Sequence, residues 1–136
     1  MKETLLYIRA PKENEERGPL YAESAIAAIH SLKGADVPVS LEIGMGHDSK
    51  IGFFVRAARG AVRLTESQLY AQYPEIDIEY LKEDPFAVAE GEQVVSMDLV
   101  LTDPEVFPIK RHPQFDDMLT RVNVDPIAGI TSTLAH

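Results

Sequence analysis

The sequence predicts an α+β fold in which helices pack against an antiparallel sheet. Two segments alternate apolar and polar residues on either side of a short polar turn, which is the pattern of a β-hairpin. Two other segments space their apolar side chains at helical intervals. Pro74 stops the second helical segment and leads directly into another alternating run, because a proline cannot extend the helical hydrogen-bond ladder.

The N-terminal part begins with a strand and a helix. Residues 4–9 are rich in Leu, Tyr and Ile, which favours a strand. Residues 11–19 form a polar segment bracketed by prolines and are expected to be a solvated loop. Residues 20–32 then place apolar side chains at helical spacing, and Gly34 stands where a helix C-cap is expected.

The next elements complete a four-stranded unit. Residues 37–45 and 51–57 predict the hairpin, residues 60–73 a second helix, and residues 76–80 a closing strand. The buried stripe of the second helix is expected to hold Val62, Leu69 and Tyr73. The order β-α-β-β-α-β predicts a ferredoxin-like split arrangement, an antiparallel sheet with two helices on one face.

The C-terminal part adds a strand and a tail. Residues 93–101 alternate, with Val95, Met97, Leu99 and Leu101 on one side, and predict an additional strand that is added at a sheet edge or pairs elsewhere. Residues 115–122 predict a short helix. Asp125 and Pro126 suit the N-cap and first position of another helical stretch.

These elements divide the chain into two parts. We expect an α+β domain with its extra strand over residues 1–102 and a partly irregular extension over residues 103–136. The final residues continue a helix-like pattern without a terminating signal. We therefore expect the extension to lead into a further region beyond His136.

Composition and charge exclude several classes of function. The formal net charge of −9 at pH 7 opposes the approach of nucleic-acid phosphates, so direct nucleic-acid binding is not expected. Cysteine is absent, which excludes disulfides and thiolate metal sites. No apolar run is long enough to cross a bilayer, and the N-terminus lacks the pattern of a signal peptide. We expect a cytoplasmic protein that reaches a membrane only through its partners.

The sequence shows no motif for catalysis, cofactor binding or metal binding. A Gly-x-x-x-x-Gly-Lys-Ser/Thr phosphate loop is missing. Gly44, Gly46 and His47 join two hairpin strands rather than a strand and a helix, so they are interpreted as a structural turn. The four histidines lack ligand spacing, and no serine lies in a nucleophile context. Asp77 and Glu79 share a strand face and are interpreted as surface charge.

Two basic groupings are candidate sites for docking a partner. They are Arg56, Arg59 and Arg63, and Lys110 with Arg111 and Phe115. The first grouping surrounds the start of the second helix, where cations oppose the helix dipole, so it either pairs with nearby acids or meets an acidic partner. In the second, an aromatic beside cations can bind single-stranded nucleic acid, but a solvated loop is the simpler interpretation.

Four blocks, in order along the chain, together resemble the N-terminal region of the large ATPases of type IV secretion and conjugal transfer, of the HerA/FtsK kind. The first block is residues 6–14, 22–23 and 29–32, and the second is residues 39–43 and 51–55. The third is residues 68–74, and the fourth is residues 107–111, 114–117 and 125–134. In that family this region precedes the nucleotide-binding motor. The resemblance implies an accessory domain that helps to assemble the motor or to dock it on the secretion channel. Its partners would be other subunits, including further copies of itself, or channel proteins.

The leading hypothesis is therefore a non-catalytic interaction and assembly domain of such a motor, with ATPase chemistry located downstream of His136. The alternative is a freestanding small-molecule-binding or regulatory ferredoxin-like domain, which would show a closed pocket with converging polar groups. A small acid–base enzyme on the same scaffold is the third hypothesis, and it would require a buried carboxylate or histidine with a perturbed pKa.

Overall fold

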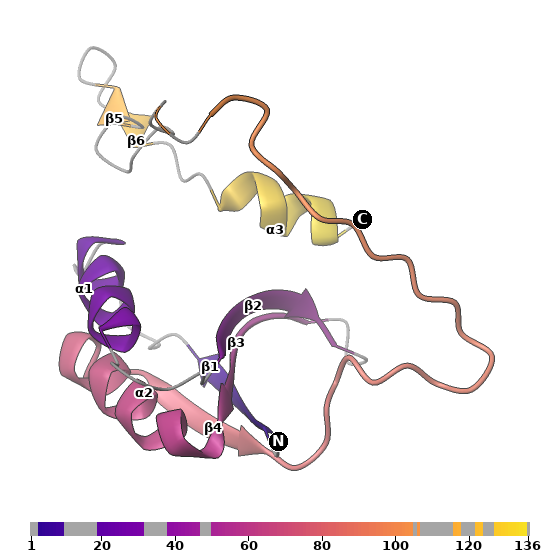
Figure 1. Cartoon of the computed structure of the whole chain (residues 1–136), viewed down its shortest axis with the longest axis horizontal. Coiled ribbons are helices and arrows are strands. Elements are labelled where there is room, and N and C mark those ends of the chain that lie inside the picture. Colours follow the sequence, from indigo (N-terminus) through magenta and orange to yellow (C-terminus); the bar gives the residue numbers. More distant parts are fainter. Residues whose placement is uncertain are drawn as a thin grey trace. The chain divides into compact units, whose positions relative to one another are not determined.

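The computed structural model describes most of the N-terminal two thirds of the chain and short stretches of the remainder (Figure 1). The described residues are 3–9, 19–31, 38–46, 50–104, 106, 116–117, 122–123 and 127–135. Contacts group the chain into two units, one built on Met1–Phe86 and the other on Ala87–Leu134.

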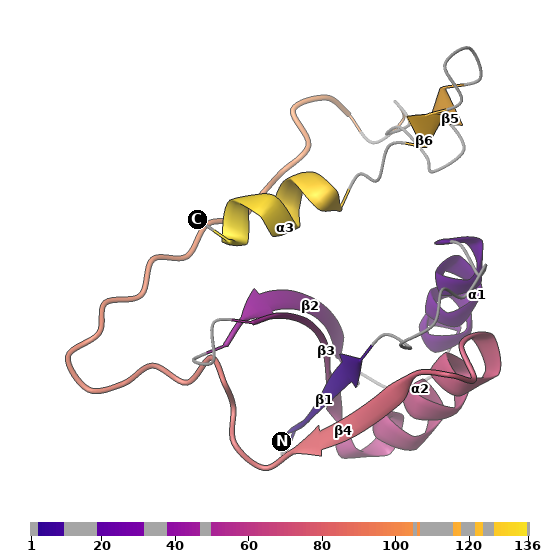
Figure 2. The same ribbon diagram turned by 180° about the vertical axis from the view of Figure 1, so that it is seen from behind.

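The first unit is a four-stranded antiparallel sheet with helices α1 and α2 on one face (Figures 1 and 2). The sheet order is β2-β3-β1-β4. The elements are β1 (Glu3–Arg9), α1 (Pro19–His30), β2 (Val39–Met45), β3 (Ile51–Ala58), α2 (Arg59–Gln72) and β4 (Asp77–Leu81). All six elements were predicted from the sequence, and each lies within two residues of its expected ends.

The core lies between the sheet and α2. Because side chains alternate along a strand, Leu6 and its register partner Val55 face the same side as Ile78. These side chains pack with Ala61 and Val62 of α2 in one buried cluster, and Leu6 has no exposed surface. Burial of this apolar surface is the main stabilising contribution to the fold.

The junction between α2 and β4 agrees with the role predicted for Pro74. The backbone N–H of Tyr73 donates to the carbonyl of Leu69 at 2.8 Å and closes the last helical turn. The helix then ends, and the N–H of Ile76 donates a hydrogen bond to the carbonyl of Tyr73. Of the predicted stripe, Val62 is buried, and Leu69 and Tyr73 are half-buried.

The hairpin strands β2 and β3 are strongly curved, and the turn end of the hairpin reaches past both helices (Figures 1 and 2). Gly46 and Lys50 close the hairpin, with the N–H of Gly46 donating to the carbonyl of Lys50 at 3.4 Å. The predicted loop before Pro19 and the predicted C-cap at Gly34 lie outside the described residues.

Two predictions for the second unit are wrong. Residues 93–101 were expected to form a strand, at a sheet edge or paired elsewhere, but they pair with no strand among the described residues. Alternation makes a segment able to form a strand, but the hydrogen bonds of a strand backbone require a partner strand. Residues 115–122 were expected to form a helix. Instead β5 (Asp116–Asp117) pairs with β6 (Val122–Asn123), because so short a helix gains few hydrogen bonds against its nucleation cost.

The last helix was predicted more successfully. Helix α3 (Ala128–Leu134) lies in the expected helical stretch, while the proposed cap at Asp125 and Pro126 is outside the described residues. No helix in the described parts of the chain is long and apolar enough to cross a membrane.

Thr65 of α2 is a polar residue within the apolar core. It is completely buried, and its hydroxyl has no hydrogen-bond partner. A buried hydroxyl without a partner costs about 1–3 kcal/mol of desolvation. We expect Thr65→Val, which keeps the shape, to raise the free energy of unfolding by about 1 kcal/mol in urea denaturation. Ser67→Val on the exposed side of the same helix is the control and should give no gain, because serine and valine have similar helix propensities and the hydroxyl of Ser67 has a hydrogen-bond partner. A Thr65→Val protein that is less stable than the wild type would contradict the claim that the Thr65 hydroxyl has no hydrogen-bond partner.

Candidate functional site

The face of the sheet opposite the helices carries a layer of aromatic rings over two glycines. Tyr7 of β1 and Phe54 of β3 are register partners, and their rings stack with centroids 5.0 Å apart. Phe86 contacts Phe54 edge to face, with centroids 4.8 Å apart. The rings sit where Gly44 and Gly52 leave room, since a Cβ on either glycine would lie 2.5 Å from the ring of Phe86 or Tyr7. We call this side of the sheet the open face.

Residues 82–86, which we call the crossing segment, run from β4 over the open face to β2. Asp84 Oδ2 lies 2.9 Å from Arg56 Nη2, and Asp84 Oδ1 accepts a hydrogen bond from the N–H of Phe86. Arg56 also donates through Nε to Glu42 of β2 at 2.9 Å. The hydrogen bond that Arg56 donates to Glu42, with a further one to Asp84, raises the pKa of Arg56 above its usual value although burial opposes the shift. Arg56 therefore holds the crossing segment on the sheet.

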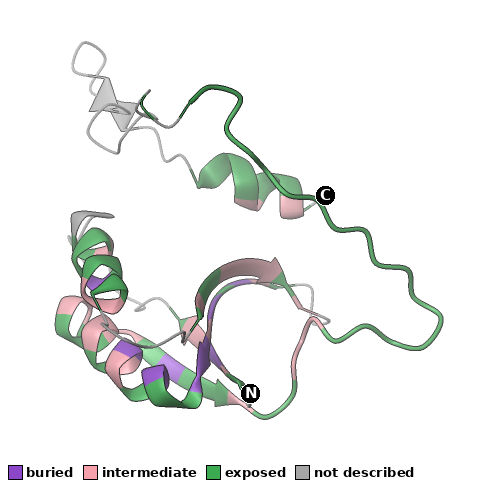
Figure 3. Ribbon diagram, in the orientation of Figure 1, coloured by how far each residue is buried: buried purple, intermediate pink, exposed green. Residues whose placement is uncertain are grey.

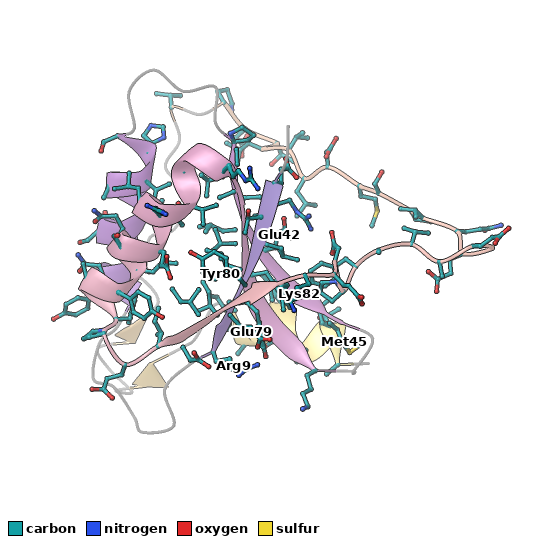
Figure 4. All side chains as sticks on the ribbon, turned by 90° about the horizontal axis from the view of Figure 1, so that it is seen from below. Arg9, Glu42, Met45, Glu79, Tyr80 and Lys82 are labelled. Carbon is teal, nitrogen blue, oxygen red and sulfur yellow. The ribbon has the colours of Figure 1, made fainter. Side chains whose placement is uncertain are left out.

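The β4 side of the open face is charged. Arg9 of β1 forms an ion pair with Glu79 of β4, beside which it lies in Figure 4. Arg9 also pairs with Asp77 of β4, and its guanidinium lies 5.2 Å from the ring centroid of Tyr7. The two carboxylates therefore pair with the same arginine, in an exposed position. This arrangement suits a charged sheet edge, which resists pairing with a further strand.

Tyr80 and Glu66 link β4 to α2 on the other face of the sheet. The phenol of Tyr80 donates to Glu66 Oε2 at 2.6 Å. This hydrogen bond is the main reason that the pKa of Tyr80 is raised above 10.0, and Arg63 acts weakly in the opposite direction. A hydrogen bond donated by the phenol favours its protonated form, so the shift has the expected sign.

The raised pKa of Tyr80 predicts a change in stability with pH. The contribution is fully present below pH 10.0 and is lost as the pH rises through the higher folded-state pKa. The wild-type free energy of unfolding should therefore fall more steeply above pH 10.0 than that of Tyr80→Phe. Denaturant unfolding at several alkaline pH values measures the difference. Glu66→Gln should lower the phenol pKa in an absorbance titration, and an unchanged titration curve would contradict the hydrogen bond.

On the helix side, β2 and the half of β3 nearest the turn present apolar side chains that the helices do not cover. Leu41 is 54% exposed, Met45 44% and Phe53 43%. The register pairs Leu41 with Val55, and Met45 with Ile51, so these side chains share the face that is buried further along β3. Figure 3 shows that β2 is exposed or half-buried along its length. We call Leu41, Met45 and Phe53 the hairpin patch.

The structure separates the residues of the first predicted docking group. Arg56 lies on the open face and pairs with Glu42 and Asp84, which agrees with the alternative that it neutralises nearby acids. Arg59 and Arg63 are exposed on α2. Lys110, Arg111 and Phe115 of the second group are outside the described residues. Within the described ranges, no three His, Cys, Asp or Glu side chains converge to hold a metal ion.

Sequence reasoning missed both the hairpin patch and the crossing segment. The alternation of β2 placed Leu41 and Met45 on one side, but it could not show that the helices leave that side uncovered. Phe86 carried no local signal, because its contacts with Gly44 and Phe54 join distant parts of the chain.

Comparisons with other proteins identify no relative: the sequence matches no known family model, no curated protein and no solved structure.

Proposed function

We propose that this chain is a non-catalytic interaction module that assembles with another subunit through the β2 side of its sheet. The observation that carries the proposal is the hairpin patch, three large apolar side chains that are each more than 40% exposed on a sheet face. Exposed apolar side chains that gather on one surface are typical of interaction sites. Among the described strands β2 is also an edge strand, and no described strand pairs with its outer side.

The two edges of the sheet differ in a way that favours β2. At the β4 edge, Asp77 and Glu79 are exposed and charged. At the β2 edge, the acidic side chain of Glu42 is only 23% exposed, against 66% for Asp77 and 46% for Glu79, and the exposed Leu41 and Met45 are available for apolar contact. Charged residues protect an edge from pairing, and apolar ones favour it.

The charged groups of the open face support a structural role over a catalytic one. Arg56 is shared by Glu42 and Asp84, and Arg9 is shared by Asp77 and Glu79. General acid–base catalysis requires a titratable group that can reach a substrate in the right protonation state. In these two clusters each carboxylate already pairs with an arginine.

We further propose that the module belongs to a motor of type IV secretion or conjugal transfer, as the resemblance of the four sequence blocks implies. The sheet order β2-β3-β1-β4 with two helices on one face supports a ferredoxin-like arrangement for this module. In such a protein the module would help to assemble the motor or to dock it on its channel.

The native gene product tests the motor assignment. Its sequence and intact mass should show a chain that continues past His136 and contains a phosphate-binding loop. A gene product that ends at His136 would contradict the motor assignment while leaving the interaction module untouched.

Substitution of the hairpin patch tests the interaction itself. Native mass spectrometry of the gene product carrying Leu41→Lys should show smaller assemblies than the wild type, because a charge replaces apolar contact surface. Ser40→Lys is the matched control, since Ser40 is exposed on the adjacent position of β2 but faces the other side of the sheet. Assemblies that are equally large with Leu41→Lys would overturn the proposed function.

A further inference from the structure

Residues 93–101, which we call the free segment, combine the pattern of a strand with full exposure. Val95, Met97, Leu99 and Leu101 alternate along it, and their exposed fractions run from 57% to 100%. Val94 and Val100 on the other side are also exposed. No residue of the segment belongs to a strand in this structure. A segment with apolar side chains and unpaired backbone groups can add as a strand to the exposed edge of a sheet.

The chain before the free segment is fixed to the β2 side of the sheet. The ring of Phe86 lies where a Cβ on Gly44 of β2 would be, so the crossing segment ends against this strand. Only residues 87–92 separate Phe86 from the free segment, so the chain can span at most about 25 Å between them when fully extended.

A turn precedes the free segment. The N–H of Glu92 donates to the carbonyl of Ala89 at 3.1 Å, and the N–H of Ala89 donates to the Glu92 carboxylate. Gly91 has a φ of 90°, a conformation that side-chain-bearing residues rarely adopt. The turn therefore reverses the chain just before residues that can form a strand.

We propose that the free segment of one copy adds as a strand to the β2 edge of a second copy, and that the exchange is reciprocal. The proposal rests on the proposed function and names the partner. Each copy carries both parts of the contact: an unpaired apolar segment, and an edge strand flanked by the exposed Leu41 and Met45. Added at that edge, the apolar side of the segment extends the hairpin patch. Because each copy supplies one segment and one edge, a closed two-fold dimer leaves neither part exposed.

The mass and the amide exchange of the full chain test the exchange of strands. With rising protein concentration, the mass from light scattering should approach twice the 15.1 kDa of one chain. Backbone amides of residues 93–101 and of β2 should become protected from hydrogen exchange over the same concentration range, since pairing between copies follows mass action. A monomer with protection independent of concentration would show pairing with the copy's own edge and would overturn the proposal. A monomer without protection at any concentration would also overturn it.

Two variants of the free segment make the test specific. Leu99→Glu places a charge among the buried side chains of the added strand and should return the protein to the monomer. Ser96→Glu, on the other side of the same segment, should leave the dimer intact. A dimer that persists in Leu99→Glu overturns strand exchange. If Leu41→Lys still disrupts the native assembly in that case, the proposed function stands and a different partner occupies β2.

Discussion

Phe54→Ala is expected to lower the free energy of unfolding by about 3 kcal/mol or more, the largest effect of any single change on the open face. Phe54 is only 6% exposed, although it lies on the face of the sheet that the helices do not cover. Its ring contacts both Tyr7 and Phe86. Removing the ring leaves a cavity and deprives the crossing segment of its apolar contact with β3. Urea denaturation measures the loss of stability, and limited proteolysis after Phe86 measures release of the crossing segment.

The neighbouring phenylalanine provides the control for this prediction. Phe53 has the same size and lies on the same strand, but it faces the helix side and is 43% exposed. Phe53→Ala should therefore cost less than half as much stability, because less apolar surface is lost from a buried environment. Equal losses in the two variants would contradict the view that the open face is a second apolar layer.

Gly44→Ala is expected to lower the free energy of unfolding by about 2 kcal/mol and to displace Phe86. The new Cβ would lie 2.5 Å from Cε1 and 2.6 Å from Cζ of the Phe86 ring, distances that require the ring to move. Gly60→Ala is the control, since no atom lies within 4 Å of its added Cβ and alanine favours a helix by roughly 0.5–1 kcal/mol. The same denaturation measurement should therefore show opposite signs for the two variants.

A double-mutant cycle identifies the cause of the Gly44→Ala effect. In a Phe86→Ala background the added methyl group meets no ring, so Gly44→Ala should cost at least about 1 kcal/mol less than in the wild type. Additive effects would show that Gly44→Ala acts through the backbone of β2, and they would remove the evidence that Phe86 is anchored there.

The order and ends of the first six elements could be predicted because local patterns determine them. The alternation around residues 46–50 defines the hairpin, and Pro74 defines the end of α2, without knowledge of the rest of the chain. The free segment has an equally clear alternation, yet the prediction that it forms a strand was wrong. Alternation shows which side chains of a segment would share one face of a strand, but it does not show whether a partner strand is available.

The candidate site could be predicted only in small part. Arg56 was predicted as a docking residue because it lies near Arg59 and Arg63 in the sequence. Its actual partners, Glu42 and Asp84, come from other parts of the fold. The exposure of Leu41 depends on where the helices end relative to a curved hairpin. Both features arise from tertiary packing, which residue spacing does not encode.

Hydrogen exchange of β2 in the assembled native gene product tests the central claim most directly. If the module assembles through the β2 side of its sheet, the outward-facing amides of Val39–Met45 should exchange more slowly in the assembly than in the isolated chain. The amides of Asp77–Leu81 at the opposite edge should keep their rates. Equal exchange of β2 in the isolated and assembled forms would contradict the proposed interaction surface.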